Sequence, residues 1–228
     1  MDARGLAAGE SQAFGMETER DVTALGRHPE RGRYDFETIV TILDAGIVCH
    51  VGVSASFGPV VIPTIYGRIE RDLYLHGSAV TRWMKTAAES LPLCVTVTIL
   101  DGLVLARSAY NHSMNYRSAV IFGNAQRVDD PDEKVRALHA IMEHVCPGRW
   151  NDARHPSDGE LRATLVLRVP IVQASAKVRT GPPIDFDFDL ASRIWAGVVP
   201  IQTVRGVPIP DPVLPADIAV PAYCEEGA

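Results

Sequence analysis

The order of apolar and turn-forming residues between positions 47 and 128 limits the folds that this chain can adopt. Short apolar runs predict strands at residues 47–53, 59–66, 68–75, 93–100, 103–108 and 115–128, and tight turns join most of them. Regular crossover helices, which parallel strands need, are missing from this series. The pattern therefore predicts an antiparallel β-barrel with flanking helices, and it disfavours a doubly wound parallel sheet.

Helix signals lie on both sides of this region. Asp35 is a good N-cap for a helix over residues 36–45, and Asp130 caps a second helix that ends at Pro147. The second helix carries an apolar stripe that consists of Val135, Leu138, Met142 and Val145. Asp101 and Gly102 form a dipeptide that is typical of a hairpin turn, so we expect one strand to end and the next to begin there.

Composition restricts the class of protein. The 228 residues suit one domain, and a net charge of -6 disfavours nucleic acid as a partner, because binding its backbone needs a broad basic surface. No apolar run approaches the roughly 20 residues that span a bilayer. The four cysteines form no CxxC pair, and the first residues do not resemble a signal peptide. We expect a cytoplasmic protein with free thiols and no membrane partner.

The composition along the chain predicts a division into three segments. Residues 1–26 are expected to be a mobile lead-in, and residues 27–203 are expected to form the folded domain. Residues 204–228 form a tail with prolines at 208, 210, 212 and 215. Such a tail is either extended along a neighbour or disordered.

A strand-turn-helix junction at residues 72–85 predicts an anion site. Gly77 permits a sharp turn, and Ser78 is the expected N-cap of the following helix. The hydroxyl of Thr81 and the cations of Arg82 and Lys85 fall within the first two turns of that helix. One phosphate group would satisfy all of these groups together with the free amides. The alternative is an ordinary capped surface helix.

Three further clusters contain candidate ligand contacts. Residues 108–118 are dense in hydrogen-bonding groups, residues 176–183 carry two cations before a rigid turn, and Trp195 lies in a short apolar island. Each also has a structural explanation, as a solvated connection, a strand end or a buried tryptophan. The sequence contains no HExxH, GxSxG, GxGxxG or Walker A motif. A phosphate site without a nucleophile or metal set indicates that a bound cofactor supplies the chemistry.

Several segments together resemble a known family. They occur in the order 31–35, 50–52, 61–66, 74–78, 113–118, 147–150, 177–181 and 195–200. The chain resembles the pyridoxamine 5'-phosphate oxidase-like, FMN-binding split-barrel family, in particular the flavin-nucleotide-binding branch that includes 5-nitroimidazole reductases. This resemblance implies a mainly β fold, a six-stranded antiparallel Greek-key split barrel with flanking helices. It also implies a homodimer with FMN in two clefts at the dimer interface.

The resemblance assigns cofactor-binding positions. Along the isoalloxazine edge it places Pro63, Thr64, Ile65 and Tyr66, and around the phosphate it places His76, Gly77, Ser78, Arg82 and Trp83. It places Asn115, Tyr116, Arg117 and Ser118 along the wall of the cleft. Trp195 is expected to close the cleft. His112 and Ser113, with Trp195, are the candidate substrate contacts. The chain departs from the expected pattern at Thr81, where a serine is expected, and at Asn111 and His112, which replace a His-His pair.

Three functions are compatible with these positions. The leading hypothesis is an FMN-dependent oxidoreductase that passes electrons from NADH or NADPH to a small planar substrate, such as a nitroaromatic or a quinone. The second is a flavin-binding carrier without turnover of its own, because no acid or base stands out. The third is a haem-binding member of the same fold, with His76 or His112 as the axial ligand.

Overall fold

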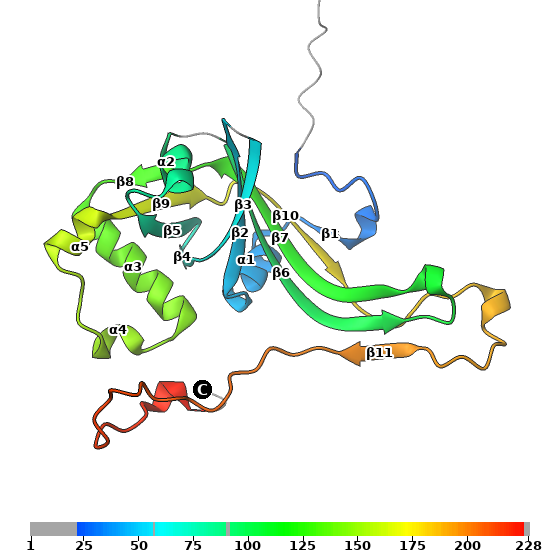
Figure 1. Ribbon diagram of the computed structural model, residues 1–228. Coiled ribbons are helices and arrows are strands. Elements are labelled where there is room, and N and C mark those ends of the chain that lie inside the picture. The colour runs from blue at the N-terminus through cyan, green and yellow to red at the C-terminus, as the bar shows by residue number, and fades with distance from the viewer. Residues whose placement is uncertain (1–21, 57, 90–91, 226–228) are drawn as a thin grey trace, which may run out of the picture.

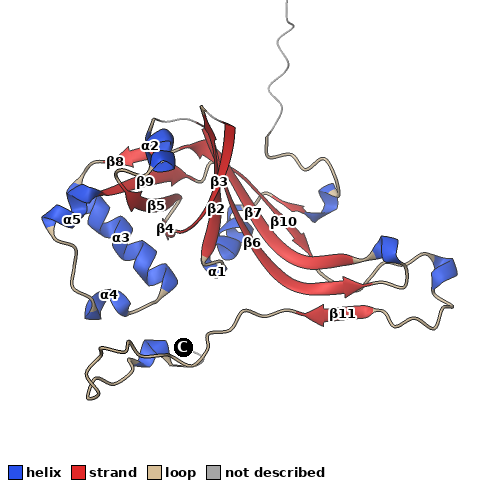
Figure 2. Cartoon of the chain, viewed as in Figure 1, coloured by secondary structure: helices blue, strands red, loops and turns tan. Residues whose placement is uncertain are grey.

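The computed structural model describes residues 22–56, 58–89 and 92–225, and most of its strands belong to one large antiparallel sheet (Figure 1; Figure 2). The strand order is β1-β10-β7-β6-β2-β3, and β11 pairs with residues 102–105 at the far end of β6. The strands are β1 (Gly32–Arg33), β2 (Val48–Ala55), β3 (Gly58–Ile65), β6 (Pro92–Leu105), β7 (Ser113–Asn124), β10 (Gln173–Arg179) and β11 (Gly197–Pro200). The predicted mainly β, antiparallel fold is confirmed, although the strands of the described residues form two sheets and no continuous barrel.

A second, smaller sheet has the order β4-β5-β9-β8 and is also antiparallel. Its strands are β4 (Gly67–Ile69), β5 (Asp72–Ser78), β8 (Gln126–Val128) and β9 (Thr164–Pro170). The single strand expected at residues 68–75 is wrong, because β4 and β5 form a hairpin there. Glu70 makes the turn with a φ of 51°. Glutamate rarely adopts this left-handed conformation, so the sequence carries no turn signal at that point.

Helices cover the sheets. They are α1 (Phe36–Ala45), α2 (Arg82–Ala88), α3 (Pro131–Val145), α4 (Arg149–Asp152) and α5 (Asp158–Ala163), with short 3-10 turns at Pro29–Arg31, Ala109–Asn111, Asp187–Asp189 and Ala222–Cys224. Both predicted caps are confirmed, since Asp35 accepts from the Thr38 amide at 2.8 Å and Asp130 accepts from the Asp132 amide at 3.1 Å. No helix of the described residues is long and apolar enough to cross a membrane.

The main core lies between the two sheets. Val51, Val95 and Ile121 of the large sheet and Leu75 and Leu167 of the small sheet are fully buried. Each such side chain stabilises the fold by about 1.5–3 kcal/mol. A second core under α3 contains Tyr74, Val128, Ala137, Ile141 and Val166. Through this second core, α3 is fixed against the small sheet.

The hairpin expected at Asp101 and Gly102 is wrong. β6 continues through this position, and its register against β7 shifts between Leu100 and Gly102, which marks a β-bulge at Asp101. Gly102 is needed for another reason, because a Cβ there would lie 3.0 Å from the Val199 carbonyl oxygen of β11. The expected strand at 115–128 is likewise divided, into β7 of the large sheet and β8 of the small one.

The far ends of β6 and β7 extend beyond the rest of the molecule as an arm, with β11 alongside (Figure 1). After Pro200 the chain returns as an extended tail toward α4 (Figure 1). There the Tyr223 hydroxyl donates to Asp152 at 2.7 Å, and Arg205 donates to the Val145 carbonyl at 3.0 Å. Most of the lead-in predicted at residues 1–26 lies outside the described residues.

Candidate functional site

The segment predicted to hold a phosphate joins β5 to α2. Ser78 is the last residue of β5, and α2 begins at Arg82, so the N-cap is Thr81 and the expectation of Ser78 as N-cap is wrong. The chain makes a turn between them, in which the Thr81 amide donates to the Ser78 carbonyl at 2.9 Å. The Ser78 hydroxyl accepts from the Val80 amide at 3.4 Å. The turn thus separates the strand from the helix by three residues.

Side chains of this segment point in two directions. Gly77 faces α2, and a Cβ at Gly77 would lie 3.0 Å from Met84 Cγ, so the absence of a side chain lets α2 pack against β5. Trp83 packs against the main core, whereas Arg82 is exposed at the start of α2. His76 and Ser78 share the other face of β5, because side chains alternate along a strand.

His76 lines an apolar pocket of about 300 Å³. Its other lining residues are Ile65, Leu138, Ile141, Met142, Val145, Cys146, Trp150 and Pro156. The imidazole Nδ1 is buried and has no hydrogen-bond partner among the described residues. Burial lowers the pKa of His76 from its ordinary value, so the ring is neutral at pH 7. A neutral imidazole with an unused nitrogen is a candidate ligand for a metal centre.

The apolar stripe of α3 contributes to this pocket. Leu138, Met142 and Val145 belong to the predicted stripe and line the pocket, while the buried residues of the helix are Lys134, Ala137 and Ile141. Three of the four stripe residues therefore line the pocket, and other residues of α3 form its buried face. Trp150 lies in the segment 147–150, which contributes to the family resemblance, but no sequence signal placed it or Cys146 beside His76.

Residues 63–65 belong to the edge strand β3, and Tyr66 joins β3 to β4. Pro63 is exposed, Thr64 donates its hydroxyl to the Ile65 carbonyl at 3.3 Å, and Ile65 lines the apolar pocket. The Tyr66 side chain is fully buried, and its hydroxyl lies 2.5 Å from the Leu43 carbonyl and 2.8 Å from the Gly46 carbonyl. This ring anchors the end of α1, so only the main chain of Tyr66 is left for a cofactor.

A second group of predicted residues lies at the start of β7 and the end of β10. Of the predicted site residues, His112, Ser113 and Tyr116 line a cavity of about 710 Å³, called the arm cavity below. Its full set of lining residues is Arg27, His28, Arg31, Tyr110, Asn111, His112, Ser113, Met114, Tyr116, Lys177, Arg179, Ile184, Asp185 and Phe186. The polar segment 108–118 and the cationic segment 176–183 thus meet in one cavity. His112 is exposed, and its Nδ1 lies 2.8 Å from the Ser108 carbonyl.

Arg179 lines the arm cavity and is held in place by Asn115 behind it. Arg179 is 6% exposed and donates to the Asn115 side-chain oxygen, and the Asn115 amide donates to the Gly181 carbonyl at 3.1 Å. Burial and the nearby Arg31 lower the pKa of Arg179. No described carboxylate forms an ion pair with this guanidinium, so the wall carries a positive charge.

The remaining predicted residues do not close this cavity. Arg117 makes a bidentate ion pair with Asp101 at 2.9 and 2.7 Å, which raises the pKa of Arg117 and offsets its charge. Ser118 donates to the Lys177 carbonyl at 3.4 Å. Trp195 is 65% exposed, and its ring covers Gly197. Within one chain, the ring of Trp195 therefore has one open face.

One chain keeps the two groups of predicted residues apart. β5 and α2 lie at one end of the molecule, and the arm that carries the beginning of β7 projects from the other (Figure 1). Neither the apolar pocket nor the arm cavity contains residues of both groups.

Comparisons with known proteins agree with this architecture. The family model described as pyridoxamine 5'-phosphate oxidase matches residues 35–178. The flavocytochrome Anf3 from Azotobacter vinelandii is 40% identical, with a TM-score of 0.85, over 90% of this chain and 95% of that one. An FAD and haem binding protein from Mycobacterium smegmatis is 35% identical, with a TM-score of 0.81, over 85% of this chain and 95% of that one.

A more distant structure is a 5-nitroimidazole antibiotic resistance protein from Bacteroides thetaiotaomicron. It is 28% identical, with a TM-score of 0.55, over 64% of this chain and 86% of that one. No curated protein sequence matches the chain.

Proposed function

The chain belongs to the pyridoxamine 5'-phosphate oxidase family, and we propose that it is a flavin-dependent redox protein that also binds haem. The observation that carries the haem part is the buried, unpartnered Nδ1 of His76 in the apolar pocket. The flavin part rests on family membership and on the polar turn beside α2. Two similar proteins, a flavocytochrome and an FAD and haem binding protein, support the combination.

The flavin would lie along β3 and the end of β5. Main-chain groups of residues 63–66 would face the ring, while Gly77, Ser78, Arg82 and Trp83 would surround the phosphate. The hydroxyl of Ser78 and the guanidinium of Arg82 provide a donor and a positive charge for it. A bound flavin supplies hydride and electron transfer, and the chain supplies orientation and electrostatics.

The residues around His76 fit a haem. Apolar side chains from β3, α3 and α4 form the pocket wall, as a flat hydrophobic macrocycle requires. Of the two predicted histidines, His76 is the one that would hold the haem iron, because His112 is exposed and already bonded to the Ser108 carbonyl. His76 and Ser78 are two residues apart on one strand face, roughly 7 Å. The residues that would hold the two cofactors are therefore neighbours on one strand.

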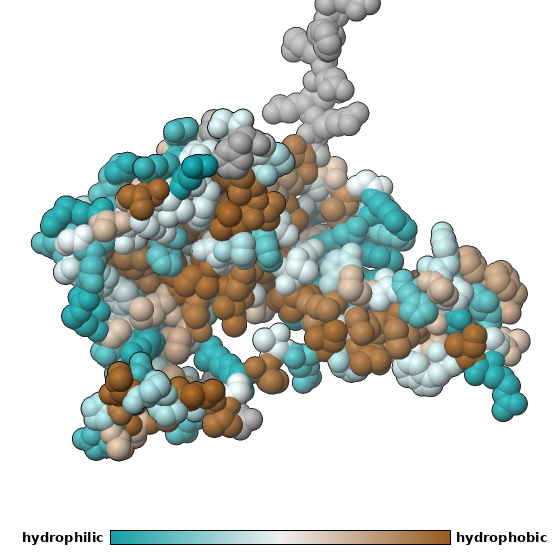
Figure 3. Space-filling model, in the orientation of Figure 1, coloured by the Kyte–Doolittle hydropathy of each residue, from teal (hydrophilic) through white to brown (hydrophobic). Residues whose placement is uncertain are grey.

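A second copy of the chain would complete the site. The arm presents Tyr116 and Trp195 away from the β5 segment of its own chain, so a partner's arm is the natural source of these contacts. Apolar side chains gather along the arm (Figure 3), where Leu100, Leu103 and Val199 are 36%, 39% and 42% exposed. Burying such a surface favours association. We propose a homodimer, with a nicotinamide donor and a small planar acceptor as substrates.

The absorption spectrum of the purified protein tests the cofactors. We expect flavin bands together with a Soret band. His76→Ala should remove the Soret band and keep the flavin bands, whereas the matched variant His112→Ala should keep both. Flavin bands alone, in the wild type supplied with haem, would refute the haem part. A protein that takes up neither cofactor would refute the whole proposal.

Anaerobic stopped-flow absorbance tests turnover. We expect NADH or NADPH to reduce the flavin-loaded protein, and a nitroaromatic or quinone to reoxidise it. Reduction by dithionite but by neither nicotinamide would contradict the oxidoreductase and favour a flavin carrier.

A further inference from the structure

The arm cavity carries a positive charge that its own wall does not balance. Four cations line it, namely Arg27, Arg31, Lys177 and Arg179. Among the described residues that line it, Asp185 supplies the one carboxylate. Both oxygens of this buried side chain are already used, because Oδ1 accepts from the Arg107 amide and Oδ2 from the Arg107 guanidinium, each at 2.9 Å. The remaining positive field concentrates small anions in the cavity.

Arg179 is the cation that the fold holds most firmly. Its Nη1 donates to the Asn115 side chain and to the Gly181 carbonyl at 3.4 Å, and its Nη2 donates to the Pro182 carbonyl at 3.2 Å. These acceptors are neutral, and the ion pairs in the described part of the chain do not include Arg179. A buried charge without a counter-charge is costly, so a bound anion would stabilise it.

The bonds of Arg179 also indicate which anion fits. A guanidinium has five N–H donors, and the three described bonds leave one donor on Nε and one on Nη2. Nε and Nη2 form one edge of the planar group, and the two oxygens of a carboxylate match such an edge as a fork.

Asn111 adds an unused donor to the same cavity. It lines the arm cavity, and its side-chain Nδ2 is buried without a hydrogen-bond partner among the described residues. Buried polar groups in native proteins are nearly always hydrogen-bonded. An oxygen-bearing ligand would supply the acceptor that this amide lacks.

Aromatic rings form another part of the cavity wall. Tyr110 and Phe186 line the cavity, with ring centroids 6.3 Å apart and planes 18° from parallel, and Phe188 stacks on Phe186 at 5.3 Å. The turns that carry these rings lie at the tip of the arm (Figure 1). The three side chains, in chain order, are 84%, 47% and 79% exposed. Exposed, nearly parallel rings offer their faces to a flat apolar ligand.

The cations and the rings together define a ligand class. We propose that the arm cavity binds a planar aromatic carboxylate, whose rings lie against Tyr110 and Phe186 and whose carboxylate accepts from Arg179. The proposal rests on the proposed function only for the role of this ligand, since it makes the small planar acceptor an anionic compound rather than a neutral one. Binding to the cavity needs no flavin and can be measured by itself.

Calorimetric titration of the full-length protein with anthraquinone-2-carboxylate and anthraquinone-2-carboxamide tests the proposal. The two probes share their flat rings and differ in charge. We expect the carboxylate to bind at least tenfold more tightly than the amide, because a charge-assisted bond changes affinity by a factor of about ten to a hundred. Arg179→Gln should remove this preference by weakening the carboxylate alone.

Three further variants separate the contributions. Arg31→Gln removes a cation without disturbing the Asn115 bond and should also weaken the carboxylate more than the amide. Tyr110→Ser removes an exposed ring and should weaken both probes about two- to tenfold. Arg193→Gln is the matched control, because Arg193 is exposed and does not line the cavity, and it should change neither affinity. Circular dichroism checks that each variant is folded.

The outcomes separate the arm cavity from the flavin. Equal affinities of the wild type for the two probes, or an unchanged preference in the folded Arg179→Gln and Arg31→Gln variants, would overturn the proposal. Displacement of the carboxylate by NADH would also overturn it, since the cavity would then belong to the nicotinamide donor. Selective binding of the carboxylate by a protein that takes up no flavin supports the arm cavity and contradicts the proposed function.

Discussion

Replacing Gly67 by alanine should separate α3 from the small sheet. Gly67 is a buried residue of β4, and a Cβ there would lie 2.5 Å from the Ile141 amide nitrogen and 2.6 Å from the Ala140 carbonyl carbon. Ordinary contacts begin at 3.4 Å. Both obstructing atoms belong to the α3 backbone, so no rotamer change can relieve the clash and the helix must move. Overpacking costs about 1–3 kcal/mol, and a backbone obstruction favours the upper end.

Thermal and urea unfolding measure this effect. At about 3 kcal/mol the melting temperature should fall by roughly 6–12 °C for a chain of this size. Gly52→Ala is the matched control, because its Cβ would lie 3.7 Å from the nearest atom and Gly52 is also a strand residue. The control should change stability by less than about 0.5 kcal/mol. Equal unfolding midpoints for the two variants would show that α3 tolerates a side chain at Gly67 and would refute the packing argument.

Two further predictions concern assembly and the flavin phosphate. Light scattering of the flavin-loaded protein should give twice the 24.8 kDa chain mass, and a mass near that of one chain would contradict the homodimer. Arg82→Ala should weaken FMN binding about ten- to hundredfold and leave riboflavin binding unchanged, because it removes a charge-assisted contact to the phosphate. Fluorescence titration measures both affinities, and an equal loss for the two flavins would contradict a phosphate contact.

Local chemistry was enough to predict the two longest helices. Asp35 and Asp130 cap them through side-chain bonds to amides two or three residues ahead, and Pro131 fills the first helical position. These interactions involve neighbours in sequence, so no knowledge of the tertiary fold is needed.

Strand boundaries were harder to predict, because distant segments decide them. Asp101 and Gly102 have the residue types of a hairpin turn, yet β7 pairs with β6 on both sides of them and β11 adds pairs to the far half. Pairing along the whole strand outweighs the local turn preference, which survives only as a bulge. At Ser78 the strand-helix junction was correctly located, but the turn length shifted the cap to Thr81.

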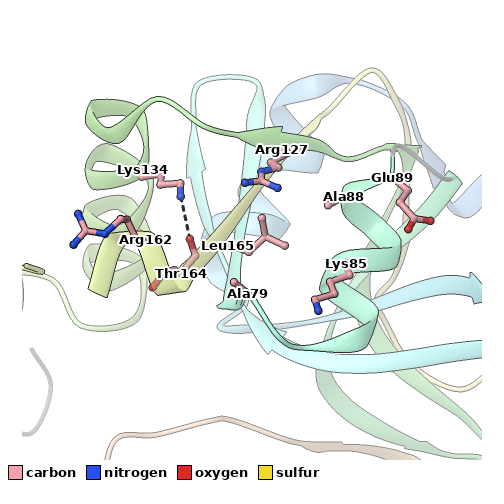
Figure 4. Close-up of a pocket in the computed structure, with 9 residues that line it drawn as sticks. All are labelled: Ala79, Lys85, Ala88, Glu89, Arg127, Lys134, Arg162, Thr164 and Leu165. Carbon is pink, nitrogen blue, oxygen red and sulfur yellow. Dashed lines mark hydrogen bonds between the residues drawn. The ribbon is translucent and has the colours of Figure 1, made fainter. Parts of the chain in front are cut away.

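The candidate site was also predicted only in part. The predicted segments at residues 108–118 and 176–183 meet in the arm cavity, since β7 and β10 are paired neighbours. A pocket of about 410 Å³ between α2, α5 and β9 was missed, because its lining cations Arg127, Lys134 and Arg162 come from three elements that only the fold brings together (Figure 4). One signal was present. Lys134 lies three positions before the buried Ala137 and seven before the buried Ile141, so a helical wheel places a charge on the buried face.

His76 should make the protein sensitive to mild acid. Burial lowers the pKa of His76 below its ordinary value of about 6.5, so the unfolded chain binds a proton more readily than the folded one. At pH 7 the imidazole is neutral in both states, so His76 does not change the free energy of unfolding. As the pH falls below about 6.5, protonation of the unfolded chain lowers the free energy of unfolding. In the cofactor-free protein, His76→Gln should show a smaller loss of unfolding free energy between pH 7 and pH 5 than the wild type.

The comparison isolates one imidazole from the general effect of acid. Carboxylates that are bonded in the native state, such as Asp185 with Arg107, also lose stability at low pH, but they do so equally in both proteins. His112→Gln is the matched control, because that ring is exposed and lies at the arm. Urea unfolding at several pH values gives the slopes. If the wild type and His76→Gln lose stability in parallel, the imidazole is already hydrated or paired in the native state, and its suitability as a neutral metal ligand would have to be abandoned.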